Sequence, residues 1–396
     1  MQKCPSEENT LIGIQAIREV IEIFSGPFLT TYFIKTSMDT ITQISIYNIF
    51  VYFILIIATA MVCYIIKRKY KIEIFRLSVI LNFVYILMII VLREKVLEHL
   101  GILAIIYGIS SATYWTPLGL FLINKVKNEK RMSYETKNQM VKTIFKIGIP
   151  ILLGGMITIS NYYMTAIIVL ILSIIQIIFS FWLKPLEDTY QKFDIKKAWN
   201  KIKGVKKIKK VLGIEYLHGL CIASSSLTVI TTILIFDVLK TDFKLGLITS
   251  ITSALQMLVV YLYNKKRRTK NDKTIILIAG IIPIVTLSIF LIYGGDITII
   301  LYSILSQIAT GFLTVIRTVQ VYNTANHKLI TINEQSEFWV IREGCISFGR
   351  ITSYILLLIV GLWRGTQGLK ILMIILTAMI ILIGIAQRYQ IEEKSV

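Results

Sequence analysis

The chain has 396 residues, of which 55% are hydrophobic, and its mean hydropathy is +0.71. A soluble core of this size cannot take up so large an apolar fraction, so the composition excludes a soluble globular protein. The formal net charge of +20 falls mostly in short loops between apolar segments, which argues against a nucleic-acid partner and for a lipid bilayer.

Twelve apolar segments are long enough to cross a bilayer, since about 20 apolar residues suffice. They form two sets of six: 11–34, 41–66, 72–93, 99–124, 141–160 and 161–183, then 211–236, 245–264, 273–293, 297–322, 338–362 and 367–387. The sequence predicts an all-α polytopic membrane protein with about 12 transmembrane helices in two six-helix pseudo-symmetric bundles. A count of ten or eleven is the alternative, because the first segment carries charges and 141–183 is nearly continuous.

A lysine-rich bridge at 184–210 separates an N-terminal bundle, 1–183, from a C-terminal bundle, 211–396. From Asp194 onward its apolar residues share one helical face: Ile195, Ala198, Trp199 and Ile202. Such an amphipathic helix is expected to lie in the cytoplasmic interface against anionic headgroups. We interpret the bridge as a linker that helps to fix topology, in preference to a regulatory or partner-binding segment.

The basic residues predict the orientation. With both termini in the cytoplasm, the inside loops hold the Lys and Arg clusters at 67–71, 125–131, 184–210 and 265–273. The outside loops hold only seven basic residues: Lys35, Arg93, Lys95, Lys240, Lys244, Arg364 and Lys370. This asymmetry predicts a multi-pass protein of the cytoplasmic membrane. Because charged residues interrupt the first segment, we expect it to be retained and not cleaved as a signal peptide.

Enzymatic and metal-binding chemistry is not expected. The four cysteines show no paired spacing, and His99, His218 and His327 are too scattered to form a metal site. No nucleotide-binding loop, nucleophile elbow or dinucleotide fingerprint occurs, and the loops are too short for a catalytic domain. We expect no cofactor and no catalytic residue, so any transport would be driven by gradients.

Weak internal repetition supports two halves of similar plan. Glu19 and Glu22 in the first segment recur as Glu215 and His218 in the seventh, at an offset of 196 residues. The basic loops at 67–69 and 265–268 recur at nearly the same offset. Parallel six-helix repeats are typical of rocker-type secondary transporters, whose site lies between the halves.

On this layout the chain resembles the major facilitator superfamily over essentially its whole length. The family loop Gly-x-x-x-Asp-Arg-x-Gly-Arg-Arg is represented at Tyr64–Lys71, which keeps the basic cluster but lacks the glycines and the aspartate. Residues 148–155 are similar to a degenerate antiporter motif, with one extra residue after Pro150, and this implies export. The pattern Glu343 to Gly349-Arg350 is similar to transporters of low-GC Gram-positive bacteria.

Charges inside the spans are the main candidate site residues, because a charge near the bilayer centre must face a cavity or a partner. Glu22 and Arg350 fall near the midplane, and Glu343 shares a helical stripe with Arg350. Arg350 is therefore expected to pair with Glu343, with Glu22 across the cavity as the second candidate partner. Four further charges, Lys146, Glu215, Arg317 and Arg342, fit a structural or a cavity role equally well.

Aromatic and polar residues complete the candidate set. They lie in the fourth, seventh and tenth segments, where Tyr107, Tyr114, Trp115 and Gln307 join the charged or titratable candidates Glu19, Glu22, Glu215, His218, Arg317, Glu343 and Arg350. A cavity with this lining would suit a small amphiphilic solute. For any one aromatic residue taken alone, helix packing or an interface position is favoured over contact with a ligand.

The function hypothesis is a monomeric secondary active transporter that moves a small solute by alternating access, coupled to protons and with export as the implied direction. The alternative is a lipid flippase or a membrane sensor that transports nothing. Transport of a soluble solute by the purified protein in vesicles distinguishes them.

The charge asymmetry makes a topological prediction. Tags at residues 200 and 268 should be accessible only from the cytoplasm, while a tag at residue 242 should be accessible from outside intact cells. Labelling of whole and permeabilised cells checks this, and an external signal at residue 268 would overturn the arrangement of two halves.

Overall fold

The computed structural model describes residues 7–36, 39–67, 71–125, 128–183, 192–266, 272–325, 329–331 and 334–392. These residues form α1 (Glu7–Ile23), η1 (Phe24–Phe28), α2 (Leu29–Thr36), α3 (Thr40–Ile66), α4 (Lys71–Leu92), η2 (Arg93–His99), α5 (Leu100–Lys125), α6 (Asn128–Ile159), α7 (Tyr162–Phe181), α8 (Ile195–Ile202), α9 (Lys206–Cys221), α10 (Ser226–Leu239), α11 (Asp242–Lys266), α12 (Asp272–Tyr293), α13 (Asp296–Ala325) and α14 (Gln335–Glu392). Cys4, His327 and parts of the basic loops at 67–69 and 265–268 lie outside the described residues.

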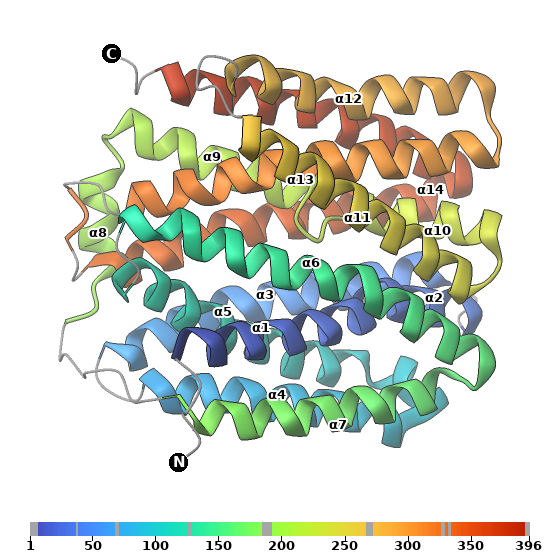
Figure 1. The fold of residues 1–396 in the computed structure, drawn as a ribbon, viewed down its shortest axis with the longest axis horizontal. Helices are drawn as coiled ribbons and strands as arrows, with labels where there is room; N and C mark the ends of the chain where they lie inside the picture. Colours follow the sequence, from blue (N-terminus) through green and yellow to red (C-terminus); the bar gives the residue numbers. More distant parts are fainter. Residues whose placement is uncertain are drawn as a thin grey trace.

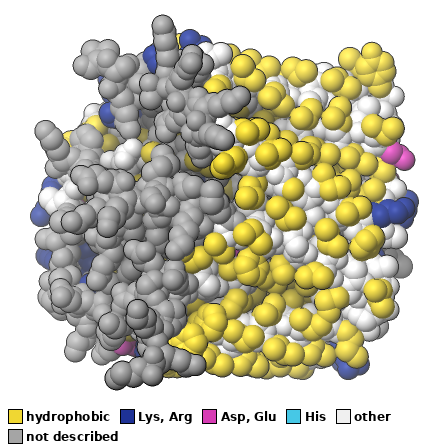
Figure 2. All heavy atoms as spheres, in the orientation of Figure 1, with side chains coloured by type: hydrophobic (Ala, Val, Ile, Leu, Met, Phe, Trp, Pro, Cys, Tyr) yellow, Lys and Arg dark blue, Asp and Glu magenta, His cyan; other side chains and the backbone are white. Residues whose placement is uncertain are grey.

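The long helices run side by side along one axis, with α8 at one end of the bundle and α2 and α10 reaching the other (Figure 1). We call these the α8 end and the α2 end. Hydrophobic side chains cover much of the face seen in Figure 2, while the charged side chains in view lie towards the two ends. The described part of the chain is helical and contains no strand. Such an apolar belt is what a lipid-facing surface requires.

Ten helical stretches among the described residues are long and apolar enough to cross a membrane. They correspond to ten of the twelve expected segments, and the last two lie within α14, at Gln335–Trp363 and Gln367–Tyr389. The eighth expected segment forms the 25-residue helix α11, and the first is divided into α1, η1 and α2. The protein is thus an all-α polytopic membrane protein, and the count of twelve fits its helices.

The first and seventh segments are interrupted at matching places. The first passes through the π-helical turn η1, which contains Pro27, because proline cannot donate a helical hydrogen bond. The seventh breaks between α9 and α10, where Ser224 has a positive φ of 52°. Residues 24–28 shifted by 196 positions fall on 220–224, so the interruptions follow the same offset as the charged residues. Helix interruptions of this kind are frequent at functional sites.

The bridge helix differs in part from its expected environment. Asp194 accepts a hydrogen bond from the Lys197 amide at 2.9 Å and so caps α8. Of its apolar face, however, Ala198 and Ile202 are buried in the protein, and only Trp199 is well exposed, at 42%. Part of the face expected to meet headgroups therefore packs against α14, and the placement of this helix in the interface stays a prediction.

The two halves of the chain meet most closely where α6 lies against α11. At Gly246 an added Cβ would lie 2.2 Å from the Pro150 carbonyl oxygen, and at Gly154 it would lie 2.5 Å from that of Asp242. Glycine is required here because the backbones themselves are in contact. These contacts fix the distance between α6 and α11.

A pair of matched substitutions tests this packing. Gly246→Ala should lower the midpoint of thermal unfolding in detergent, because its methyl group overlaps backbone atoms, at a cost of about 1–3 kcal/mol. Gly148→Ala, on the same helix pair, meets nothing within 4 Å and should be neutral or slightly stabilising. Equal unfolding midpoints for the two variants would contradict the close approach.

Candidate functional site

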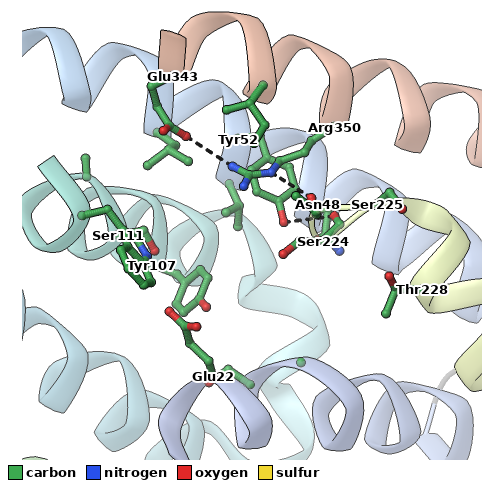
Figure 3. A pocket seen from close by; sticks show the side chains of 18 of the residues that line it. Glu22, Asn48, Tyr52, Tyr107, Ser111, Ser224, Ser225, Thr228, Glu343 and Arg350 are labelled. Carbon is green, nitrogen blue, oxygen red and sulfur yellow. Dashed lines mark hydrogen bonds and ion pairs between the residues drawn. The ribbon is translucent and has the colours of Figure 1, made fainter. Parts of the chain in front are cut away.

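A cavity of about 590 Å³ lies between helices from both halves of the chain. Its walls come from α1, η1, α2, α3, α5 and α6 on one side and from the α9–α10 break, α10, α13 and α14 on the other. Figure 3 shows Glu22 and Tyr107 facing Arg350 and Glu343 across this space. The volume is that of a small-molecule site.

On the first-half side, the carboxylate of Glu22 is joined to a buried arginine. Arg18 is 1% exposed, and its Nε donates to Glu22 Oε1 at 3.0 Å. The guanidinium also donates to Asn82 Oδ1, and its Nη2 lies 3.2 Å from Ser111 Oγ. The rings of Tyr107 and Tyr114 lie 5.7 and 5.0 Å from the Arg18 Cζ atom. Arg18 is therefore held by several neutral groups besides its one carboxylate.

Glu22 itself keeps contact with the cavity. Its side chain is 29% exposed, against 12% for Glu19, 9% for Glu343 and 0% for Glu215. Glu19 pairs with Lys146 at 3.2 Å. Glu22 is thus the most accessible carboxylate of the paired charges around the cavity.

On the second-half side, five charged residues form one continuous chain of ion pairs. Their order is Arg317, Glu215, Arg342, Glu343 and Arg350, with nearest N to O distances of 3.3, 2.5, 2.8 and 3.3 Å. These ion pairs join helices α13, α9 and α14. Three guanidiniums share two carboxylates, so this group of five charged residues carries one excess positive charge.

Arg350 connects this charge chain to the helix break. Its Nε donates to the Ala223 carbonyl at 3.0 Å, and its guanidinium lies 5.0 Å from the Tyr52 ring centroid. The Tyr52 hydroxyl donates to the Ser224 carbonyl at 3.3 Å (Figure 3). Tyr52 belongs to α3, so a first-half side chain contacts both the arginine and the break. Arg350 offsets the carbonyl charge at the end of α9.

The structure assigns the candidate residues to different places. Seven of them line the cavity: Glu19, Glu22, Tyr107, Trp115, Arg317, Glu343 and Arg350. Three others, Tyr114, Glu215 and His218, are buried behind the cavity lining. Gln307 is exposed on α13 and does not line the cavity, so its expected position has to be corrected. The described residues of α13 that line the cavity are Arg317, Thr318 and Tyr322, because a helix presents only one face to it.

The expected partner of Arg350 is present, since Glu343 lies 3.3 Å away. The second expected partner, Glu22, pairs with Arg18 instead. The i, i+4 spacing of Arg18 and Glu22 could have revealed this pair in the sequence. Three further residues at the site are not predicted from the sequence: Arg18, Tyr52 and the cavity-lining Lys142.

Ion pairs join the two halves at each end of the bundle. At the α8 end, Lys67, directly after α3, pairs with Glu337 of α14, and both side chains are buried. Glu337 also accepts from the Asp194 amide at 2.9 Å. At the α2 end, Lys35 pairs with Asp242 of α11. Asp242 also accepts from Thr31 Oγ1 at 2.7 Å. The cavity lies between these two sets of contacts.

The chemistry available at the site is charge pairing, hydrogen bonding and aromatic contact. His218 is buried and lies 3.0 Å from the Thr314 hydroxyl. Within the described ranges, no group of three or more His, Cys, Asp and Glu side chains is arranged to hold a metal ion. The arrangement suits binding of a polar or charged solute and transfer of protons.

Comparisons with known proteins agree with this architecture. The family model described as Major Facilitator Superfamily matches residues 15–333. Uncharacterized protein YqgE of Bacillus subtilis (strain 168) is 22% identical over 357 residues, which are 89% of this chain and 82% of that protein.

Solved transporters share the fold at low sequence identity. A bacterial homologue of the iron transporter ferroportin has a TM-score of 0.69 both in its inward-facing state, at 13% identity, and in its outward-facing state, at 14%. Each comparison covers 98% of this chain and at least 99% of the other. The nucleoside transporter NupG has a TM-score of 0.70 at 13% identity over 97% of this chain and 100% of its own.

The charge chain predicts unequal effects of neutralising its members. Glu215→Gln should lower the free energy of unfolding by about 3–5 kcal/mol. Among the described residues, it leaves Arg317 without a carboxylate partner and Arg342 with only one. The double variant Glu343→Gln/Arg350→Met removes one charge of each sign and should cost much less. Thermal unfolding in detergent compares the two variants. A Glu215→Gln protein as stable as the double variant would argue against the chain of ion pairs.

Proposed function

Because this chain belongs to the Major Facilitator Superfamily, we propose that it is a secondary active transporter that moves a small amphiphilic solute across the cytoplasmic membrane by alternating access. The observation that carries the proposal is the cavity, which is lined by both halves of the chain and carries charged residues on both walls. A buried charge is costly unless it binds a ligand or is paired with an opposite charge. The number of charged residues at this central cavity therefore supports a transport site.

In this proposal, residues 1–183 and 211–396 act as two bundles that expose the cavity to each side of the membrane in turn. The ion pairs Lys67–Glu337 and Lys35–Asp242 join the bundles at opposite ends and would have to open alternately. The α8 end faces the cytoplasm, as the basic loops predict. The chain acts without a cofactor.

Protons are the proposed coupling ion, and Glu22 is the proposed carrier. Its carboxylate contacts the cavity, so it can exchange protons with water there. When Glu22 is neutral, Arg18 keeps its contacts with Asn82, Ser110 and Ser111, which reduce the cost of leaving that guanidinium without a carboxylate. The site can therefore accept both protonation states of Glu22.

Export is the proposed direction, supported by the resemblance of residues 148–155 to the antiporter motif. A screen of labelled solutes in proteoliposomes, with and without a pH gradient, tests both direction and coupling. Movement of a fluorescent phospholipid without movement of any soluble solute would favour the flippase alternative.

Proton coupling predicts a specific phenotype for Glu22→Gln. The amide can still accept a hydrogen bond from Arg18, so the protein should fold with an unfolding midpoint close to that of the parent. It should lose accumulation driven by a pH gradient while keeping solute exchange at equal pH, because only the proton step is removed. Paired measurements of gradient-driven uptake and counterflow in proteoliposomes separate the two.

The matched control is Asp237→Asn, which removes a carboxylate that is 74% exposed and lies outside the cavity lining. It should leave both fluxes unchanged. Unaltered gradient-driven uptake in Glu22→Gln would remove Glu22 from the coupling mechanism.

A further inference from the structure

The charges around the cavity do not balance. The residues that line it, together with their ion-pair partners in the described part of the chain, comprise six cations and four carboxylates. Arg18 and Glu22 match one to one, as do Lys146 and Glu19. The excess of two positive charges comes from the second-half charge chain and from Lys142.

The excess positive charge lies on two groups with donors available to a ligand, Lys142 and Arg317. Within the part that the structure describes, no carboxylate pairs with Lys142, whose ammonium group lies 5.4 Å from the Trp115 ring centroid. Arg317 reaches Glu215 through Nη1 alone, and its buried Nε has no hydrogen-bond partner in the described part of the chain. A buried donor without a partner destabilises the protein, so a ligand acceptor there would be favourable.

Aromatic rings lie beside three of the cations around the cavity. Trp115 lies beside Lys142, Trp339 beside Arg342 at 5.1 Å, and Tyr52 beside Arg350 at 5.0 Å. All three rings line the cavity. Flat apolar surfaces next to cations are complementary to a molecule that joins an apolar or aromatic body to an anionic group.

We propose that the solute is a small organic anion, with its anionic group bound by Lys142 and Arg317 and its apolar part placed against the aromatic rings. This inference rests on the proposed transport function and adds its substrate class. The anion supplies the negative charge that the cavity lacks, which compensates the excess cations in a low-dielectric site. Arg350 is not the primary anion ligand, because the Ala223 carbonyl, Glu343 and Tyr52 already contact its guanidinium.

Binding to the purified protein in detergent, by titration calorimetry, tests the charge preference directly. The probes are benzoate, phenyl phosphate, benzyl alcohol and benzylammonium, which share a ring and differ in charge. The two anions should bind, and the alcohol and the cation should bind more weakly by about tenfold or more. Tighter binding of phenyl phosphate than of benzoate would identify a phosphate group, and the reverse a carboxylate.

Two variants locate the site. Lys142→Met and Arg317→Gln should each weaken benzoate binding by about tenfold without changing the affinity for benzyl alcohol. Lys240→Met, at an exposed lysine outside the cavity, should bind benzoate as the parent does. If Arg317→Gln does not fold, Lys142→Met decides alone, because no carboxylate among the described side chains would lose its partner.

Three results would overturn the proposal: no binding of either anion, benzylammonium binding as tightly as benzoate, or Lys142→Met binding benzoate with unchanged affinity. These outcomes are separable from failure of the transport function. Anion binding without any solute flux in vesicles would reject transport and keep the anion site, while gradient-driven flux of cationic solutes alone would keep transport and reject the anion.

Discussion

A guanidinium that is buried in a membrane protein must find oxygen atoms to accept its hydrogen bonds, and this constraint determines which helices lie together around the cavity. Arg18 on α1 requires Asn82 of α4 and two serines of α5 beside it. In the second half, Glu215 of α9 stands between arginines of α13 and α14. Apolar contacts alone would leave the rotation of these helices poorly fixed, since lipid is as apolar as their side chains.

The same requirement links charge to the helix interruptions. A break in a helix leaves carbonyl groups without helical partners, and within a bilayer those groups need donors from elsewhere. Arg350 and Tyr52 supply them at Ala223 and Ser224, so the break in the seventh segment is satisfied by side chains from both halves. The break and the charge chain therefore form one structural unit, and neither can be changed without affecting the other.

The sequence predicts the spans well and the site only in part. Hydropathy over about 20 residues is a local property, which is why ten expected segments coincide with candidate spans. The Glu343–Arg350 pair could be predicted because both residues lie on one helix. Contacts between helices, such as Glu215 with Arg342, depend on rotation and depth that one sequence does not encode locally. For the same reason the sequence predicts Gln307 at the cavity, where it does not lie, and does not predict Lys142, which does line it.

The glycine contacts between α6 and α11 limit how the halves can move. Most helix pairs are separated by a layer of side chains, which can change rotamer and absorb a displacement. At Gly154 and Gly246 no such layer exists, because backbone meets backbone. Sliding or separation along this seam would lose close contacts that no side chain can replace, whereas tilting about it keeps them. If the halves move as alternating access requires, a tilt about the α6–α11 seam would preserve these contacts, and the helices farthest from the seam would be displaced most.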